Sequence, residues 1–297
     1  MRAFASVSAI SAALAAVGAA VGAAAGAAAL AAAVPGAGAA TASPPHRVAS
    51  LNLCTDELLL LLADPRQIAS VTHLSRNPAE TPLWRRARAF AVNDGSLVSV
   101  VASRPDLVLT MGGGARDRAG IAARLGIRLL DLPYPLTLDD VGRSASVVAA
   151  ALGRPAAASP VIGGIRRLRR DAPARAVDSL WLGGGGRTVA AGSLSAQWMA
   201  LAGLRQRNIA GDRVPLETLL VDPPALILRS DYRRGQYSSE QRWLANPLVA
   251  RVRRSRTLTT DGRVWNCMGP LMLGEIARLK AAIRENPAGR AAIGAAR

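Results

Sequence analysis

Two cysteines, Cys54 and Cys267, are the residues of this sequence best suited to covalent or metal chemistry. Cys54 follows a short apolar run and Cys267 closes the segment 263–267, so both are expected at the ends of strands. Three arrangements fit them: a disulfide, two unpaired cysteines that are buried or face a cleft, and joint ligation of a metal or cofactor. An even number of cysteines in an exported chain favours pairing, and closing so long a loop would stabilise the fold by about 5 kcal/mol.

Histidines and glycine runs give weaker signals. The sequence has two histidines, His46 and His73, so a metal site is not expected and His73 is interpreted as a polar cleft wall. The glycines of 112–114 and 183–186 match neither phosphate-binding pattern and are interpreted as turns that let the backbone approach a ligand. Ser193 lacks a GxSxG context, and few general bases are present. We therefore expect no catalysis, no cofactor and no resident metal.

The positive charge is large, +17, but almost all of it is arginine in a chain rich in alanine and glycine. This pattern reflects GC-rich codons as much as an anionic partner. The clusters 166–170 and 251–256 do not interleave with aromatic residues, so we interpret them as solvated faces and not as nucleic-acid sites. Arg233 and Arg234 are the best candidates for an anionic ligand, because guanidinium groups match carboxylate, catecholate or hydroxamate oxygens. A solvated surface loop is the alternative.

Residues 1–42 have the features of a secretory signal peptide: a positive start, a long uncharged alanine-rich stretch, and Ala40 and Ala42 at a small-residue cleavage site. Cleavage after Ala42 would start the mature protein near Ser43. An uncleaved anchor is the alternative, although alanine inserts poorly into membranes. We expect a soluble periplasmic protein, which argues against a nucleic-acid partner.

Alternating strands and helices must position these residues. The predicted strands are 47–53, 67–72, 105–111, 127–133, 179–185, 223–230, 256–260 and 263–267, and the predicted helices are 55–64, 97–104, 116–126, 194–203 and 270–283. Such βα units predict mostly parallel sheets with helices on both faces. The stretch 137–172 is purely helical in pattern, with breaks at Pro155 and Pro160, and is interpreted as a spacer.

The sequence therefore predicts an α/β fold with two lobes. Its parts are an N-terminal lobe at 46–136, a linker helix region at 137–172, a C-terminal lobe at 176–285 and a frayed tail at 286–297. Ligands of such sheets bind outside the carboxyl ends of the strands, so a cleft between the lobes is the expected binding site.

The ordered segments resemble the periplasmic substrate-binding proteins of ABC importers for iron siderophores and vitamin B12. They are RVASLNLCTDELLLLLADPRQIASVTHLS, ASRPDLVLTMGGG, LGIRLLDLP, AGSLSAQWMALAGLRQRNIAG, VPLETLLVDPPALIL and DGRVWNC, within residues 46–283. The resemblance implies Rossmann-like lobes bridged by one long helix. It also implies a monomer that captures a ferric siderophore or corrinoid (cobalamin) and delivers it to an importer permease. The alternative is an exported α/β enzyme that uses the same cleft.

The positions of the strand ends predict which residues bind the ligand. They are Asn52, Cys54, Thr55, His73, Met111, Tyr134, Arg233, Arg234, Trp265, Asn266 and Cys267. The scarcity of aromatic residues favours a siderophore over vitamin B12. For permease docking, Glu217 matches the second-lobe glutamate that the resemblance implies, whereas Val98 occupies the first-lobe position. Glu80 and Asp94 are the candidate substitutes.

Overall fold

The first lobe is built on a parallel sheet of five strands. The computed structural model describes residues 43–113, 116–232, 246–247 and 255–285. The strands are β1 Val48–Ser50, β2 Ile68–Thr72, β3 Ala91–Asn93, β4 Leu107–Met111 and β5 Arg128–Leu132, in the order β3-β2-β1-β4-β5. Every neighbouring pair is parallel, so the carboxyl ends of all five strands share one edge.

Helices connect these strands. They are α1 Leu53–Leu62, α2 Trp84–Ala87, α3 Leu97–Val101 and α4 Arg116–Arg124. Asn52 begins α1, because its side-chain oxygen accepts a hydrogen bond of 2.9 Å from the Thr55 N–H. The leucines of α1 are buried on several sides, since the helix contacts both the sheet and the linker helix α5 (Leu138–Ala151). The leucine run therefore makes α1 a core helix.

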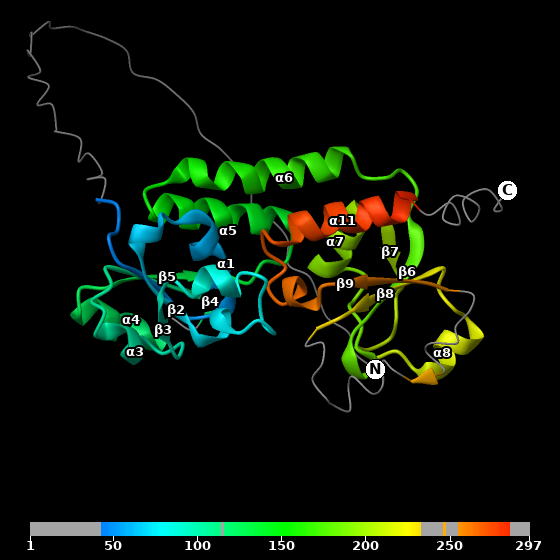
Figure 1. Ribbon diagram of the computed structural model, residues 1–297, viewed down its shortest axis with the longest axis horizontal. Coiled ribbons are helices and arrows are strands. Elements are labelled where there is room, and N and C mark those ends of the chain that lie inside the picture. Colours follow the sequence, from blue (N-terminus) through cyan, green and yellow to red (C-terminus); the bar gives the residue numbers. More distant parts are fainter. Residues whose placement is uncertain (1–42, 114–115, 233–245, 248–254, 286–297) are drawn as a thin grey trace, which may run out of the picture. The chain divides into compact units, whose positions relative to one another are not determined.

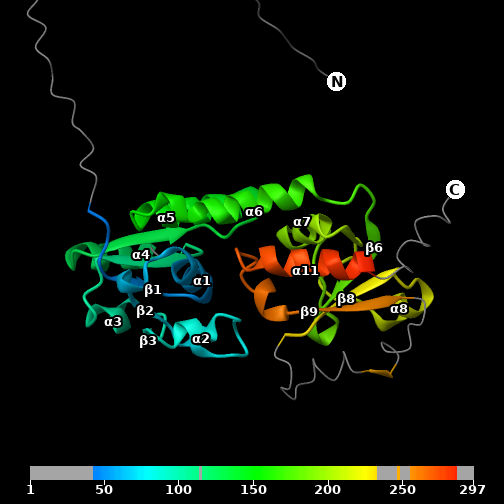
Figure 2. The ribbon, with the colours of Figure 1, turned by 45° about the horizontal axis from the view of Figure 1, so that its top comes forward.

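The linker contains two helices, divided near the break that the sequence predicts at Pro155. They are α5 Leu138–Ala151 and α6 Ser159–Arg170, joined by the 3-10 turn Pro155–Ala158. Gly153 follows α5 with φ +71°, a conformation that ends a helix easily, whereas Pro160 lies in the first turn of α6, where its missing N–H is not needed. Figures 1 and 2 show that α6 lies beside α5. Its other end contacts α11 (Met272–Glu285) of the second lobe. A single helix, α6, thus makes the crossing.

The second lobe has a parallel sheet of four strands. The strands are β6 Val177–Leu182, β7 Leu204–Gln206, β8 Leu226–Ser230 and β9 Arg256–Thr260, in the order β7-β6-β8-β9, and the helices are α7 Leu194–Leu201, α8 Leu216–Val221 and α11 Met272–Glu285. The predicted strand 263–267 is wrong. Asp261 caps a 3-10 turn there, Gly262–Trp265, by accepting from the Arg263 N–H. The α/β fold with two parallel sheets is confirmed.

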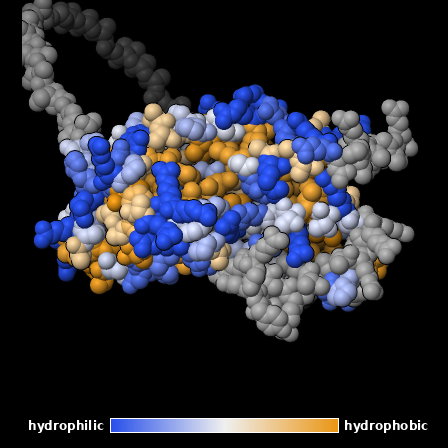
Figure 3. All heavy atoms as spheres, viewed as in Figure 1, coloured by the Kyte–Doolittle hydropathy of each residue, from blue (hydrophilic) through white to orange (hydrophobic). Residues whose placement is uncertain are grey.

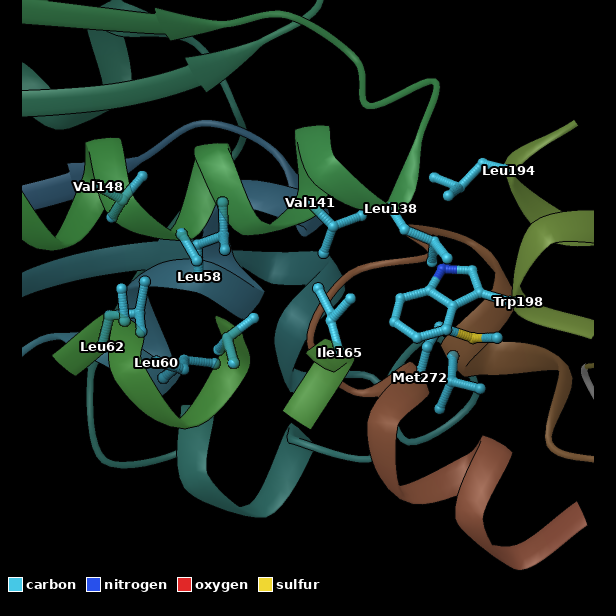
Figure 4. Close-up of a cluster of buried hydrophobic side chains, with 14 of the residues drawn as sticks. Leu58, Leu60, Leu62, Leu138, Val141, Val148, Ile165, Leu194, Trp198 and Met272 are labelled. Atoms are coloured by element: carbon cyan, nitrogen blue, oxygen red, sulfur yellow. The ribbon is translucent and has the colours of Figure 1, made fainter. Parts of the chain in front are cut away.

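One apolar cluster extends through the helices of both lobes. Figure 4 shows Leu138 of α5, Leu194 and Trp198 of α7 and Met272 of α11 gathered in it. Trp198 is fully buried, and its indole N–H donates to the Met268 carbonyl at 3.0 Å. Burial of side chains of this size stabilises the fold by about 2–3 kcal/mol each. The helices therefore form the core that the two lobes share.

Candidate ligand cleft

The carboxyl edges of the two sheets meet at a disulfide. Cys54, in the first turn of α1, is bonded to Cys267, which follows β9 and its 3-10 turn, with a Cα–Cα distance of 5.2 Å. No free cysteine is present in the chain. Of the three arrangements left open by the sequence, the disulfide is therefore confirmed, and the unpaired and metal-ligating ones are wrong. The bond joins residues 213 positions apart.

Glu57 reinforces this junction one helical turn after Cys54. Its Oε1 accepts a hydrogen bond of 2.9 Å from the Leu271 N–H of the second lobe, and the side chain is 5% exposed. Burial raises the pKa of Glu57 to about 7, although the Leu271 N–H opposes the shift. A Cβ on Gly269 would lie 2.7 Å from the same Oε1, so a larger residue there would displace the Glu57 carboxyl from this position. We call Cys54, Glu57, Cys267 and Leu271 the clasp.

A second buried carboxylate shapes the first lobe beside the clasp. Asp56 accepts hydrogen bonds from the Thr72 N–H, the Thr72 hydroxyl at 2.5 Å and the Ser75 hydroxyl at 2.6 Å. Burial raises the pKa of Asp56 although these donors oppose the shift. Asp56 thus fixes the end of β2 and the turn after it, which carries the exposed His73.

Two polar contacts join the lobes at another place. The Tyr232 hydroxyl, after β8, donates to Glu80 Oε2 at 2.5 Å, and Arg263 Nη1 donates to the Pro78 carbonyl at 2.8 Å. Arg263 is held in turn by Asp261, whose carboxylate accepts from Nε at 2.8 Å and from Nη2 at 2.6 Å. Burial raises the pKa of Asp261, but the hydrogen bonds from Arg263 outweigh it and leave the pKa lowered. We call Pro78, Glu80, Tyr232 and Arg263 the rim contacts.

A polar hollow of about 570 Å³ lies beside the rim contacts. It is lined by Pro78, Ala79, Asp231, Thr259, Thr260, Asp261, Arg263 and Arg278. A second hollow, about 20 Å³ and mostly apolar, lies against the clasp and is lined by Cys54, Leu58, Met111, Pro135, Val141, Ser144, Cys267, Gly269 and Pro270. The lobe junction is thus open and polar at the rim and closely packed at the clasp.

The predicted first-lobe ligand residues lie together at the strand ends but differ in exposure. Thr55 is fully buried and shares a hydrogen bond of 2.7 Å with the Ser50 hydroxyl, and Met111 is 8% exposed. Asn52 is partly buried and caps α1, while its amide also donates to the Met111 carbonyl at 3.4 Å. Tyr134, by contrast, is 64% exposed, so its ring forms part of the surface.

Tyr134 lies over Gly112 at the carboxyl edge of the first sheet. A Cβ on Gly112 would overlap the Tyr134 ring, and Gly112 has φ +97°, which favours glycine. Leu136, two residues along the same segment, is 73% exposed. The backbone carbonyl of Leu136 accepts a hydrogen bond of 3.1 Å from the Gln197 side chain of α7. This segment offers an exposed apolar surface next to the lobe junction, and the sequence reasoning did not single out Leu136.

A pair of tryptophans marks the second-lobe edge. Trp265 is 6% exposed and donates to the Thr260 hydroxyl at 2.7 Å, and its ring centroid lies 6.0 Å from that of Trp181. The Trp181 indole nitrogen is buried and has no hydrogen-bond partner within the described residues. Asn266 is exposed beside them, whereas the predicted ligand residues Arg233 and Arg234 lie outside the described residues. The sequence analysis did not single out Trp181.

The docking candidates differ in exposure. Glu217 is exposed in the first turn of α8, and Val98, in the first turn of α3, is 83% exposed. Glu80 is 7% exposed and engaged with Tyr232. Asp94 is exposed just before α3, and hydrogen bonds from Ser96 and Ser99 lower its pKa to about 2. Of the two proposed substitutes, Asp94 alone is accessible.

Within the described ranges, no group of three or more histidine, cysteine or acidic residues is arranged to hold a metal ion. None of the helices in the same part of the chain is long and apolar enough to cross a lipid bilayer.

Comparison with known proteins identifies the fold. No family model and no curated protein matches the chain. Among solved structures, a periplasmic heme-binding protein from Pseudomonas aeruginosa matches with a TM-score of 0.59 and 20% identity, over 80% of this chain and 92% of that one. The chain has the fold of a periplasmic binding protein.

Two further structures share this periplasmic-binding-protein fold. The vitamin B12-binding protein BtuF of Vibrio cholerae matches with a TM-score of 0.58 and 17% identity, over 81% of this chain and 97% of that one. The siderophore-binding protein BauB, bound to acinetobactin and ferric iron, gives a TM-score of 0.63 and 13% identity, over 81% and 93%. The fold therefore extends over nearly the full length of these proteins.

Proposed function

We propose that the protein captures a metal chelate between its lobes and delivers it unchanged to an ABC importer permease. The observation that carries this proposal is the meeting of two parallel sheets at their carboxyl edges, joined by α6, in a fold shared with such carriers. Ligands of parallel sheets bind at this edge. The ligand classes of the matched structures make heme a candidate beside ferric siderophores and corrinoids.

Binding is tested by titrating the purified protein with hemin, cyanocobalamin and a panel of ferric siderophores, and by following tryptophan fluorescence and calorimetric heat. Trp181 lies near the end of β6 and Trp265 in the 3-10 turn after β9, so both report on this site. We expect saturable binding to one class at micromolar or lower concentration. Absence of binding across the panel, with the protein folded, would contradict the proposal.

A matched pair of leucines locates the site. Leu136 follows β5 at the carboxyl edge, whereas Leu125 precedes β5 at the opposite edge and is also exposed, at 48%. We expect Leu136→Ala to weaken ligand binding by about 5- to 10-fold through lost apolar contact, and Leu125→Ala to leave it unchanged. Equal effects of the two substitutions would place the ligand elsewhere.

The enzyme alternative predicts a chemical change in the captured molecule. Mass spectrometry of the ligand after prolonged incubation distinguishes the two. Recovery of the intact ligand supports a carrier, and a product that accumulates with more than one turnover supports the exported enzyme.

Docking to the permease is proposed to involve Glu217 of the second lobe and Asp94 near the exposed Val98 of the first. An exposed glutamate on one lobe and an accessible aspartate on the other offer two anionic points for permease arginines. We expect Glu217→Gln to reduce uptake into permease-containing vesicles without changing ligand affinity, and Asp94→Asn to do so less. Glu285→Gln, at the exposed end of α11, is the control. Unchanged uptake by Glu217→Gln excludes this contact.

Export is proposed to depend on the leader at residues 1–42, with cleavage after Ala42 and release of a monomer into the periplasm. The intact mass of protein recovered from the periplasm tests cleavage, because an uncleaved anchor would retain the mass of the leader. Light scattering of the same sample tests the monomer.

A further inference from the structure

Helix α6 carries an exposed basic face. Its apolar side, with Val161 and Ile165, is buried against the core, while Arg166, Arg167 and Arg170 are exposed. In Figure 3, hydrophilic side chains cover the upper edge of the molecule, where Figure 1 places α6. The interpretation of this cluster as a solvated helix face agrees with the exposure, and the arrangement of its charges decides whether it also suits an anionic partner.

These three arginines have no carboxylate partner in the described part of the chain. Asp139 pairs with Arg169 at 2.7 Å and Asp140 pairs with Arg143 at 2.6 Å, while Asp171, exposed at the end of α6, makes no ion pair with these three arginines among the described residues. Three like charges within five residues of one helix repel one another, so an anionic surface would stabilise them. The helix therefore presents net positive charge on a side that faces away from the core.

The first described residues, just after the leader, lie against the linker. Pro44 lies against Gly153, at the end of α5, and the Pro45 carbonyl accepts a hydrogen bond of 2.9 Å from Gln67. The 42 residues before this point carry no charged side chain after Arg2. The proposed export through the leader would hold residues 43–45, next to the linker helices, at a membrane surface until cleavage.

We propose that the basic face of α6, formed by Arg166, Arg167 and Arg170, docks on a lipid bilayer that contains anionic phospholipid headgroups. Each arginine near such a surface strengthens binding roughly 5-fold, so the three together strengthen it about 100-fold at low salt. The face exposes no large apolar side chain, so the contact is electrostatic and is weakened by salt. Helices α3 and α8 lie on the opposite side of the molecule (Figure 1), so they face away from the bilayer in this state, and the protein leaves the bilayer before it docks on a permease.

The test is sedimentation with vesicles of phosphatidylcholine alone and of phosphatidylcholine with about a third phosphatidylglycerol. The protein is purified from cells that export it, and its first residue is determined by mass. We expect binding to the anionic vesicles, little binding to the neutral ones, and a steep loss between about 50 and 300 mM salt. Binding that does not depend on phosphatidylglycerol overturns the proposal.

Two triple variants with the same charge change provide the control. Arg166→Gln, Arg167→Gln and Arg170→Gln together should weaken binding to the anionic vesicles about 100-fold. Arg85→Gln, Arg86→Gln and Arg88→Gln, exposed in α2 and at the residue that follows it, should change it less than 3-fold. Equal losses would assign the binding to net charge and overturn the proposal, as would a normal affinity of the α6 variant.

The weaker vesicle binding of the α6 variant is evidence for the proposal only if the variant unfolds at the same denaturant concentration as the unchanged protein. If it is destabilised, Arg166→Lys, Arg167→Lys and Arg170→Lys keep the charge and should restore binding; failure to restore it overturns the proposal. Ligand titration of the same samples separates this inference from the proposed function, because either can fail while the other holds.

Discussion

At the clasp, the lobes are joined by the Cys54–Cys267 bond and by a buried carboxylate, Glu57, whereas at the rim they meet through polar contacts beside a hollow of about 570 Å³. The clasp is closely packed and cannot separate without breaking a covalent bond. The rim contacts can exchange for water at modest cost. The difference indicates that any opening of the lobes is a rotation about the clasp, with the rim as the side that moves.

The largest effect is expected from cutting the clasp. Replacing Cys54 and Cys267 by alanine should lower the free energy of unfolding by about 5 kcal/mol, because the bond closes a loop of more than 200 residues. Guanidinium titration of the variant, and of the unchanged protein with and without a reductant, measures the loss. A loss below about 1 kcal/mol would mean that the bond does not stabilise the fold by restricting the unfolded chain.

Glu57 should make the clasp sensitive to pH. Its pKa is about 7 in the fold and 4.5 as a free side chain, so the folded state holds the extra proton between these values. Its contribution to stability is therefore complete below about pH 4.5 and is lost as the pH rises through 7, by about 3 kcal/mol. Glu57→Gln, which keeps the acceptor for Leu271, should be less sensitive to pH between 5 and 8. Identical slopes of unfolding free energy against pH in the two proteins would contradict this assignment.

At the rim, Tyr232→Phe should cost about 1–2 kcal/mol, because it removes a donor from the buried Glu80. It should also widen the opening, which fluorescence transfer between dyes on the two lobes can measure. The control is Tyr134→Phe, whose side chain is exposed and for which we expect no change. A larger destabilisation than that of the cysteine variant would reverse the comparison between the clasp and the rim.

The smallest effect is expected for Arg263→Gln. The side chains of Arg263 and Asp261 are each about 30% exposed, so solvent screens their ion pair. Its loss should lower the free energy of unfolding by less than about 1 kcal/mol. The measured quantity is again the free energy of unfolding. A cost above 2 kcal/mol would show that the Pro78 contact contributes more than its exposure suggests.

Much of the fold follows from the sequence, because long buried strands such as β4 and β8 and the leucines of α1 have unmistakable patterns. The three-residue strands β3 and β7 were missed, since so short a segment has no readable period. The segment 263–267 has the apolar content of a strand, but the Asp261 cap turns the backbone into a 3-10 helix. Gly153 and Pro155 divide the linker, where the sequence predicted the break but the family resemblance implied one helix.

The site was predictable in location but not in its contacts. The strand ends put Cys54 and Cys267 at one cleft, whereas pairing depends on a tertiary distance that spacing cannot supply. Glu57 was not predicted, because a glutamate beside a leucine run is typical of a helix surface, and only the packing of α1 against Gly269 buries it. Glu80 was expected on the surface, but Tyr232 from the other lobe covers it.

The wide separation of the two cysteines has a consequence for how the molecule matures. Synthesis proceeds from the amino terminus, so Cys54 waits as a thiol until nearly the whole polypeptide has followed it. Because the sequence has two cysteines in all, an incorrect pairing can arise only between separate molecules. Dilution therefore protects the correct bond, and crowded newly made chains are where cross-linked dimers should first accumulate.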